Sequence, residues 1–151
     1  MSLKEYQKKR NFSKTSEPRG KVKGTISKKH IFVVHEHHAR NLHWDLRLQM
    51  HGVLKSWAIP KRPPTSKNLK RLAIQVEDHP LGYAKFEGII PEGHYGAGKV
   101  EIWDKGTFEI ESAKPDKIVF HLQGTRLIGK YVLVKTKYGA KPEKSWLFFK
   151  I

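Results

Sequence analysis

Histidine side chains crowd one short stretch of the sequence, FVVHEHHARNLHWDLRLQ (32–49), which also carries an aspartate and an arginine. Imidazole and carboxylate groups are ligands for divalent metals such as Zn, Mn, Fe or Ni. A guanidinium beside such a cation can grip phosphate oxygens in a bidentate fork. The stretch has two interpretations: a metal site that faces a phosphate, or a histidine-bearing strand on the solvent surface.

The alternating pattern of HWDLRLQM (43–50) predicts a strand with two different faces. Successive side chains of a strand point to opposite sides. The residues with chemically capable side chains therefore share one face: His43, Asp45 and Arg47. The opposite face suits a hydrophobic core and consists of Trp44, Leu46 and Leu48.

The preceding segment, 30–37, predicts a second strand that is rich in aliphatic residues and histidine. If the turn HARNL (38–42) pairs the two strands antiparallel, His37 and His43 face each other across it. Two imidazoles and the Asp45 carboxylate would then converge and leave coordination positions open for water or substrate. A cation held there would polarise a bound phosphate.

A second polar stretch, RLAIQVEDHPLGY (71–83), contains further candidates. Arg71 and Glu77 share one face of a predicted strand, and a turn begins at His79. This histidine could donate a proton to a leaving oxygen or bind a phosphate, although a histidine in a turn is more commonly structural. Tyr83 follows the turn. Lys61, after WAIP, has the ordinary setting of a surface lysine.

Short runs of strand-forming residues, separated by Gly, Pro and Asn, follow residue 30 and predict an all-β sheet, sandwich or barrel with little helix. Residues 61–70 predict a loop. The expected strands are 30–37, 43–50, 53–60, 71–78, 83–88, 99–104, 106–111, 117–124, 129–136 and 145–151.

The 151 residues suggest one domain, and the net charge of +16 favours a polyanionic partner, with nucleic acid ahead of an anionic membrane. Residues 1–29 hold ten Lys or Arg against two Glu, which predicts a flexible basic arm. Residues 30–151 would form the folded domain.

The absence of cysteine excludes disulfides and zinc-finger sites. The N-terminus lacks the apolar run of a signal peptide, so we expect a soluble, cytoplasmic protein without membrane contact. GHYGAGKV (93–100) nearly matches a nucleotide-binding P-loop, but Val100 replaces the required hydroxyl. It predicts a Gly-rich hairpin loop.

Four segments, in this order, resemble the 3′-phosphoesterase domain of bacterial DNA ligase D and its stand-alone versions: HEHHARNLHWDLRL, GVLKSWAIPK, KRLAIQVEDHPLGYAKFEGIIPEGHYGAG and VEIWDKG. The resemblance extends from about Tyr6 to the C-terminus. It implies a compact β-barrel with a crescent-shaped groove. It also implies a manganese enzyme, with Co²⁺ or Zn²⁺ as other candidate metals. Such enzymes remove a 3′-terminal ribonucleoside and then the remaining 3′-phosphate at primer–template ends, giving a 3′-OH for repair.

The same resemblance assigns roles by motif. The metal ligands would be His37, His43 and Asp45. The phosphate and substrate would be held by Arg47, Lys61, Arg71, His79 and Tyr83, with Glu77 in support. The arm would assist ribonucleoside removal through Arg10 and Asn11, but Asn11 replaces the usual aspartate and cannot supply a carboxylate. A separate DNA ligase and polymerase are the expected protein partners.

Two other functions fit parts of the sequence. A non-catalytic basic β module would explain the charge and would bind nucleic acid without metal. A non-haem iron oxygenase would use His43 and Asp45 with a distant His94 or His121, although the basic charge and short chain argue against it.

Overall fold

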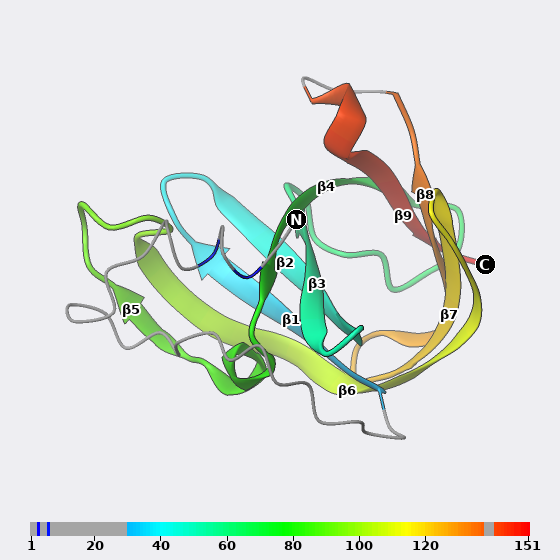
Figure 1. Cartoon of the computed structure of the whole chain (residues 1–151), viewed down its shortest axis with the longest axis horizontal. Coiled ribbons are helices and arrows are strands. Elements are labelled where there is room, and N and C mark those ends of the chain that lie inside the picture. Colours follow the sequence, from blue (N-terminus) through cyan, green and yellow to red (C-terminus); the bar gives the residue numbers. More distant parts are fainter. Residues whose placement is uncertain (1–2, 4–5, 7–29, 138–140) are drawn as a thin grey trace.

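The computed structural model describes Leu3, Tyr6 and residues 30–137 and 141–151 (Figure 1). Within these residues the chain forms strands and two short 3₁₀ helices. The strands are β1 (His30–His38), β2 (Leu42–Met50), β3 (Val53–Ile59), β4 (Lys70–His79), β5 (Gly88–Ile90), β6 (Gly98–Lys114), β7 (Lys117–Gln123), β8 (Ile128–Lys135) and β9 (Ser145–Lys150). The 3₁₀ helices are η1 (Leu81–Lys85) and η2 (Pro142–Lys144). Among the described residues, no helix is long and apolar enough to cross a membrane.

Eight of the strands close into an antiparallel barrel in the order β1-β2-β3-β4-β9-β8-β7-β6, because β6 pairs with β1. The prediction of an all-β barrel with little helix is confirmed. The ninth strand, β5, lies outside the ring and pairs only with the beginning of β6. Figure 1 shows the long β6 running from β5 at one end to β7 at the other.

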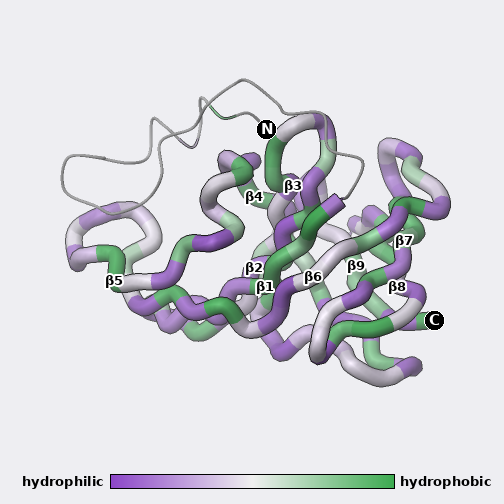
Figure 2. Tube along the Cα trace, turned by 90° about the horizontal axis from the view of Figure 1, so that it is seen from below, coloured by the Kyte–Doolittle hydropathy of each residue, from purple (hydrophilic) through white to green (hydrophobic). Residues whose placement is uncertain are grey.

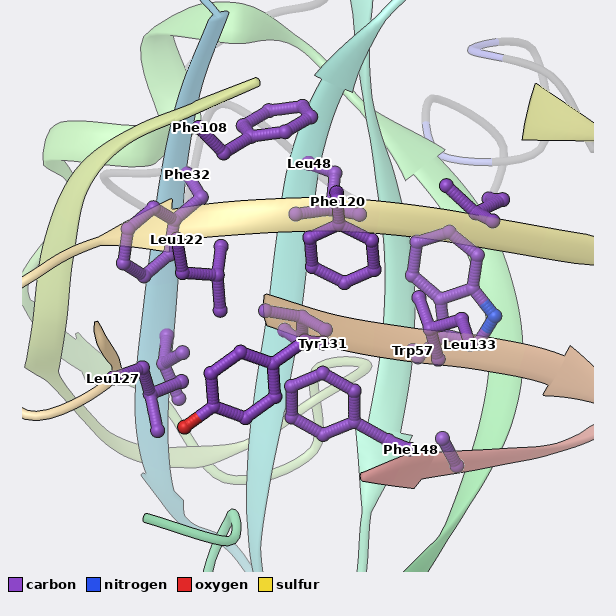
Figure 3. Close-up of a cluster of buried hydrophobic side chains, with 14 of the residues drawn as sticks. Phe32, Leu48, Trp57, Phe108, Phe120, Leu122, Leu127, Tyr131, Leu133 and Phe148 are labelled. Carbon is purple, nitrogen blue, oxygen red and sulfur yellow. The ribbon is translucent and has the colours of Figure 1, made fainter. Parts of the chain in front are cut away.

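The barrel interior is filled by large apolar side chains from all around the ring. Polar and apolar residues alternate along its strands (Figure 2), as expected when one face of each strand is buried. In Figure 3, Phe120, Tyr131 and Phe148 from β7, β8 and β9 meet side chains of β1, β2 and β3. The predicted core face of β2 is confirmed, since Leu46 and Leu48 are fully buried there.

A second apolar cluster covers the outside of the barrel at β1. Val33 points outward because it alternates with Phe32 and Val34, which face the interior. η1 and β5 pack over this outer face. The cluster consists of Tyr6, Val33, Leu54, Tyr83, Ala84, Phe86, Ile90 and Val100. Tyr6 belongs to the predicted basic arm, whose other residues, except Leu3, lie outside the described residues.

Two strand predictions were wrong. Residues 83–87 are not in a strand, and only Gly88 begins one, β5: η1 occupies Leu81–Lys85, with local bonds from Tyr83 N to Pro80 O and from Phe86 N to Tyr83 O. Residues 99–104 and 106–111 belong to one strand, β6. Gly106 lies within β6 at a position where only glycine fits, because the backbone carbonyl of Gln123 leaves no room for a Cβ.

Candidate active site

His37 and His43 lie directly opposite each other in the antiparallel ladder of β1 and β2. Their ring centroids are 4.7 Å apart. The short turn between the strands sets this register, and it confirms the pairing expected from the sequence. Both rings lie on the outer face of the barrel, because Val34 of β1 and Leu46 of β2, which have the opposite parity, face the core.

Asp45 completes a compact group with the two histidines. Its Oδ2 lies 3.8 Å from His37 Nδ1, and its Oδ1 lies 3.3 Å from His43 Nε2. One nitrogen or oxygen atom from each residue falls within 4.8 Å of the others. Asp45 is only 6% exposed, so its charge is shielded from bulk water. The group contains His37 and neither His94 nor His121, contrary to the oxygenase interpretation.

Backbone carbonyls hold the far nitrogen of each imidazole. His37 Nε2 donates to the carbonyl of Gly96 at 2.8 Å, and His43 Nδ1 donates to that of Asn41 at 3.0 Å. When the imidazoles are neutral, these bonds place the remaining lone pair of each ring on the nitrogen nearest Asp45, where a metal would replace the hydrogen bond to the carboxylate. Metal-binding histidines are commonly oriented through such bonds. The residues therefore fit a divalent transition metal.

The charges of the group reinforce one another. Burial favours the neutral acid, but the Arg47 guanidinium and hydrogen bonds from His37 and His43 outweigh it and hold the pKa of Asp45 well below its usual range. Burial disfavours the imidazolium form of His43, but the hydrogen bond and charge of Asp45 raise the pKa of His43 overall. Asp45 thus stays anionic across the physiological pH range.

Arg47 lies next to Asp45 and is 3% exposed. Its Nη2 donates to Asp45 Oδ2 at 3.3 Å, and its Nη1 lies 3.2 Å from His79 Nδ1. The guanidinium carbon sits 4.9 Å from the centroid of the Tyr83 ring. A buried guanidinium held on several sides offers an anion a fixed pair of donors.

His35 holds Arg47 from behind and is fully buried. Its Nδ1 accepts from Arg47 Nε at 3.0 Å, and its Nε2 donates to the Phe86 carbonyl at 3.0 Å. Burial and the charge of Arg47 lower the pKa of His35 to about 3. Its place on the same strand face as His37 was the sequence signal for this role.

His79 is 3% exposed and lies at the end of β4. Its Nδ1 is 3.0 Å from the Glu77 carbonyl and 3.5 Å from Ser56 Oγ. The rings of Tyr6 and Tyr83 pack edge-on against it, with centroid distances of 4.9 and 4.7 Å. The contact with Tyr6 was not foreseen, because no local pattern links residues so far apart in the sequence.

A pocket of about 280 Å³ brings most of the predicted site residues together. Those lining it are His37, His43, Asp45, Arg47, Glu77, His79 and Tyr83. One extra residue in β4, between the positions paired with Leu54 and Ser56, lets both Val76 and Glu77 reach the pocket. Simple alternation had placed these two neighbours on opposite faces.

Lys61 and Arg71 line a separate hollow of about 220 Å³ and do not line this pocket. Arg71 Nε donates to the carbonyl of Arg62 at 2.9 Å. The two residues assigned to the arm, Arg10 and Asn11, lie outside the described residues.

The Gly-rich segment forms the predicted hairpin, since Ile90 of β5 pairs with Gly98 of β6. It also contributes Tyr95 and Gly96 to the pocket wall. The sequence pattern predicted the turn but not this second role. Gly96 acts through its backbone carbonyl, which leaves no side-chain signal.

Comparison with known proteins shows which family this chain resembles. The model of the DNA ligase D 3′-phosphoesterase domain matches residues 35–135. The multifunctional non-homologous end joining DNA repair protein LigD of Mycobacterium tuberculosis is 47% identical over 138 residues, which cover 89% of this chain and 18% of that protein. LigD of Pseudomonas aeruginosa is 44% identical over 154 residues, covering 98% of this chain and 18% of that protein. The chain spans about a fifth of the length of these relatives.

Proposed function

The chain belongs to the DNA ligase D 3′-phosphoesterase family, and we propose that it is a manganese-dependent enzyme that removes a 3′-phosphate from nucleic-acid ends. The product would be a 3′-OH, the end that repair synthesis and ligation require. The observation that carries this proposal is the convergence of His37, His43 and Asp45 beside the buried Arg47. Phosphate hydrolysis needs both a cation and fixed donors around charged oxygens.

His37, His43 and Asp45 would hold the metal. When bound, manganese would polarise the phosphoryl group and offset the charge that develops on its oxygens. Cobalt or zinc would suit the same nitrogen and oxygen ligands. Hydrogen bonds to the carbonyls of Gly96 and Asn41 keep the other nitrogen of each imidazole directed toward Asp45.

Arg47 would bind further oxygens of the same phosphate. Asp45, His35 and Tyr83 hold its guanidinium in place, so little side-chain entropy is lost when an anion arrives. Lys61 and Arg71 would contact phosphate from the separate hollow that they line. Glu77 would support the substrate at the pocket wall.

In the hydrolysis of a 3′-phosphate, a water oxygen bonds to phosphorus while the bond from phosphorus to the sugar oxygen breaks, and the sugar oxygen must gain a proton as it leaves. We assign this proton transfer to His79, which lines the pocket. The Glu77 carbonyl lies at its Nδ1, so Nε2 would exchange the proton with substrate. Tyr83 packs against the same ring and would keep it aligned.

The removal of a 3′-terminal ribonucleoside is the second proposed reaction. In this family the step is expected to involve the N-terminal arm, where Asn11 stands in place of aspartate. The variant Asn11→Asp should therefore increase ribonucleoside removal relative to phosphate removal. If Asn11→Asp and the wild-type protein remove the ribonucleoside at the same rate relative to the phosphate, the arm has no such role in this step.

The direct test uses primer–template DNA that ends in a 3′-phosphate or in one ribonucleotide, with manganese or with EDTA. Turnover should require the metal and should disappear in His43→Ala. His121→Ala is a matched control, because His121 is bonded to Glu111 on the outer surface, away from the pocket. Salt-sensitive binding with no turnover and no bound metal would instead support a non-catalytic nucleic-acid-binding module.

The proposed partners follow from the product. A 3′-OH end is a substrate for a polymerase and a ligase, and we propose that separate enzymes of these kinds act after this chain. The relatives are named as multifunctional end-joining proteins, and the matched segment covers 18% of each.

A further inference from the structure

Two exposed arginines stack on Trp103, a residue of the barrel core. The guanidinium carbons of Arg62 and Arg126 lie 5.5 and 4.8 Å from the centroid of its ring. Trp103 is 9% exposed, so only a small part of this residue reaches the surface. Within the described part of the chain, neither arginine forms an ion pair with a carboxylate. Their charges are therefore available to a partner.

The segment that carries Arg62 is anchored to the barrel. It connects β3 to β4 and includes the buried Pro63 and Pro64. The hydroxyl of Tyr131, a fully buried core residue, donates to the Pro64 carbonyl at 2.8 Å. Arg62 thus extends from a fixed backbone.

The turn that carries Arg126 is anchored independently. The Asp104 carboxylate accepts backbone N–H bonds from Thr125, Arg126 and Leu127 at 2.9, 3.1 and 2.8 Å. Asp104 follows Trp103 directly in β6 and is 4% exposed. One short piece of β6 therefore fixes both the turn and the ring on which Arg126 stacks.

The two arginines lie near the end of the barrel that carries the metal-ligand group. Ile59, the last residue of β3, pairs with Trp44, which is adjacent to His43. Arg62 follows three residues later, and its carbonyl accepts from Arg71, which lines the neighbouring hollow. Basic side chains thus continue from the pocket region toward Trp103.

We propose that Arg62 and Arg126 form a phosphate clamp for the double-stranded part of a nucleic acid whose 3′ end occupies the pocket. This inference rests on the proposed function. Stacking on Trp103 fixes planar side chains that would otherwise lose considerable rotamer entropy on binding. Their N–H edges can then pair with the phosphates of a duplex. Each phosphate neutralised would release condensed counterions.

The test measures binding of a fluorescent primer–template duplex by anisotropy, in EDTA so that the DNA stays intact. Loss of two phosphate contacts in Arg62→Gln/Arg126→Gln should weaken binding on the order of 50-fold at 0.1 M salt and reduce the salt slope by about 2. The matched control is Lys114→Gln/Lys117→Gln. These lysines are exposed at the β6–β7 hairpin, and the control removes the same net charge.

Arg62→Lys/Arg126→Lys separates charge from stacking. It should retain the salt slope but recover only part of the affinity, because an ammonium group lacks the planar surface that stacks on indole. The clamp is overturned if the glutamine variant matches the lysine control, or if the wild-type protein does not bind the duplex. Arginine-dependent binding in EDTA, together with no turnover in manganese, would leave the clamp standing and would refute the phosphoesterase proposal.

Discussion

The Nδ1 atom of His35 accepts a hydrogen bond from Nε of Arg47 at 3.0 Å, while its Nε2 donates to the Phe86 carbonyl at 3.0 Å. Only a neutral imidazole can make both bonds, because an imidazolium has no acceptor. A fully buried histidine therefore ties the site arginine to the backbone that follows η1. The terminal Nη atoms of Arg47 are left to meet His79 and Asp45.

Replacing His35 by phenylalanine should impair the site without emptying the space that the ring fills. The variant leaves a buried guanidinium donor unpaired, which should cost about 1–3 kcal/mol in urea unfolding. Misalignment of Arg47 should lower kcat for 3′-phosphate hydrolysis about 100-fold, with a smaller change in KM. His35→Gln retains an acceptor and should recover part of kcat. Equal losses in both variants would argue against this positioning role.

Asp45→Asn should abolish tight manganese binding. Calorimetric titration of the wild-type protein should give one metal ion per chain, and manganese should raise its melting temperature as a ligand of the native state. The variant loses the anionic ligand of the group, so both effects should vanish. Glu101→Gln is the matched control. Glu101 belongs to a second group with Glu36 and His38, but it already pairs with Lys99. If metal binding survives in Asp45→Asn but is lost in Glu101→Gln, the metal binds at the second group and not at Asp45.

Gly96→Ala should weaken metal binding through the backbone. Gly96 has a φ of +77°, which is unfavourable for alanine, and its carbonyl accepts from His37. Distortion of this loop should lower manganese affinity about 10- to 100-fold, as loss of a bond that orients a metal ligand typically does. Gly93→Ala is a close control, with a φ of +87° and no atom within 4 Å of the added Cβ. Equal effects of the two substitutions would show general loop strain instead.

Tyr131 should make the fold sensitive to high pH. Burial, followed by the charge of Asp104, raises the pKa of Tyr131 to about 12 from its ordinary value of 10. The folded state thus favours the protonated phenol. Its contribution is complete below pH 10 and is lost as the pH rises through 12, by about 2–3 kcal/mol in total. Urea midpoints between pH 9 and 12 should fall more steeply for the wild-type protein than for Tyr131→Phe, and parallel curves would contradict this.

The convergence of His37, His43 and Asp45 could be predicted because it depends on local rules. A two-residue period places His43 and Asp45 on one face, and a short turn brings His37 opposite His43. The hydrogen bonds that orient the group could not be predicted in this way. They join His37 to Gly96 and His35 to Phe86, residues more than fifty positions apart. Such contacts exist only once β5 and η1 have packed against the outside of the barrel.

The errors in strand placement have equally local causes. The segment YAKFEG has the aromatic content of a strand. It instead begins within a 3₁₀ helix that follows Pro80 and is held by two local hydrogen bonds, and its apolar side chains pack in the cluster outside the barrel. An extra residue in β4 interrupts its alternation near Glu77. A pattern of residue types does not reveal an inserted residue, because the interruption is defined by the partner strand.

The long strand β6 serves two structures at once. It pairs with β1 and β7 in the barrel wall, and its first residues pair with β5, which carries Ile90 of the pocket. The pocket wall and the barrel therefore share one hydrogen-bonded strand, and we expect the wall not to unfold before the barrel does. Amide hydrogens of β5 and of the first part of β6 should exchange with solvent largely through global unfolding. On heating, catalytic capacity and secondary structure should disappear in a single cooperative transition.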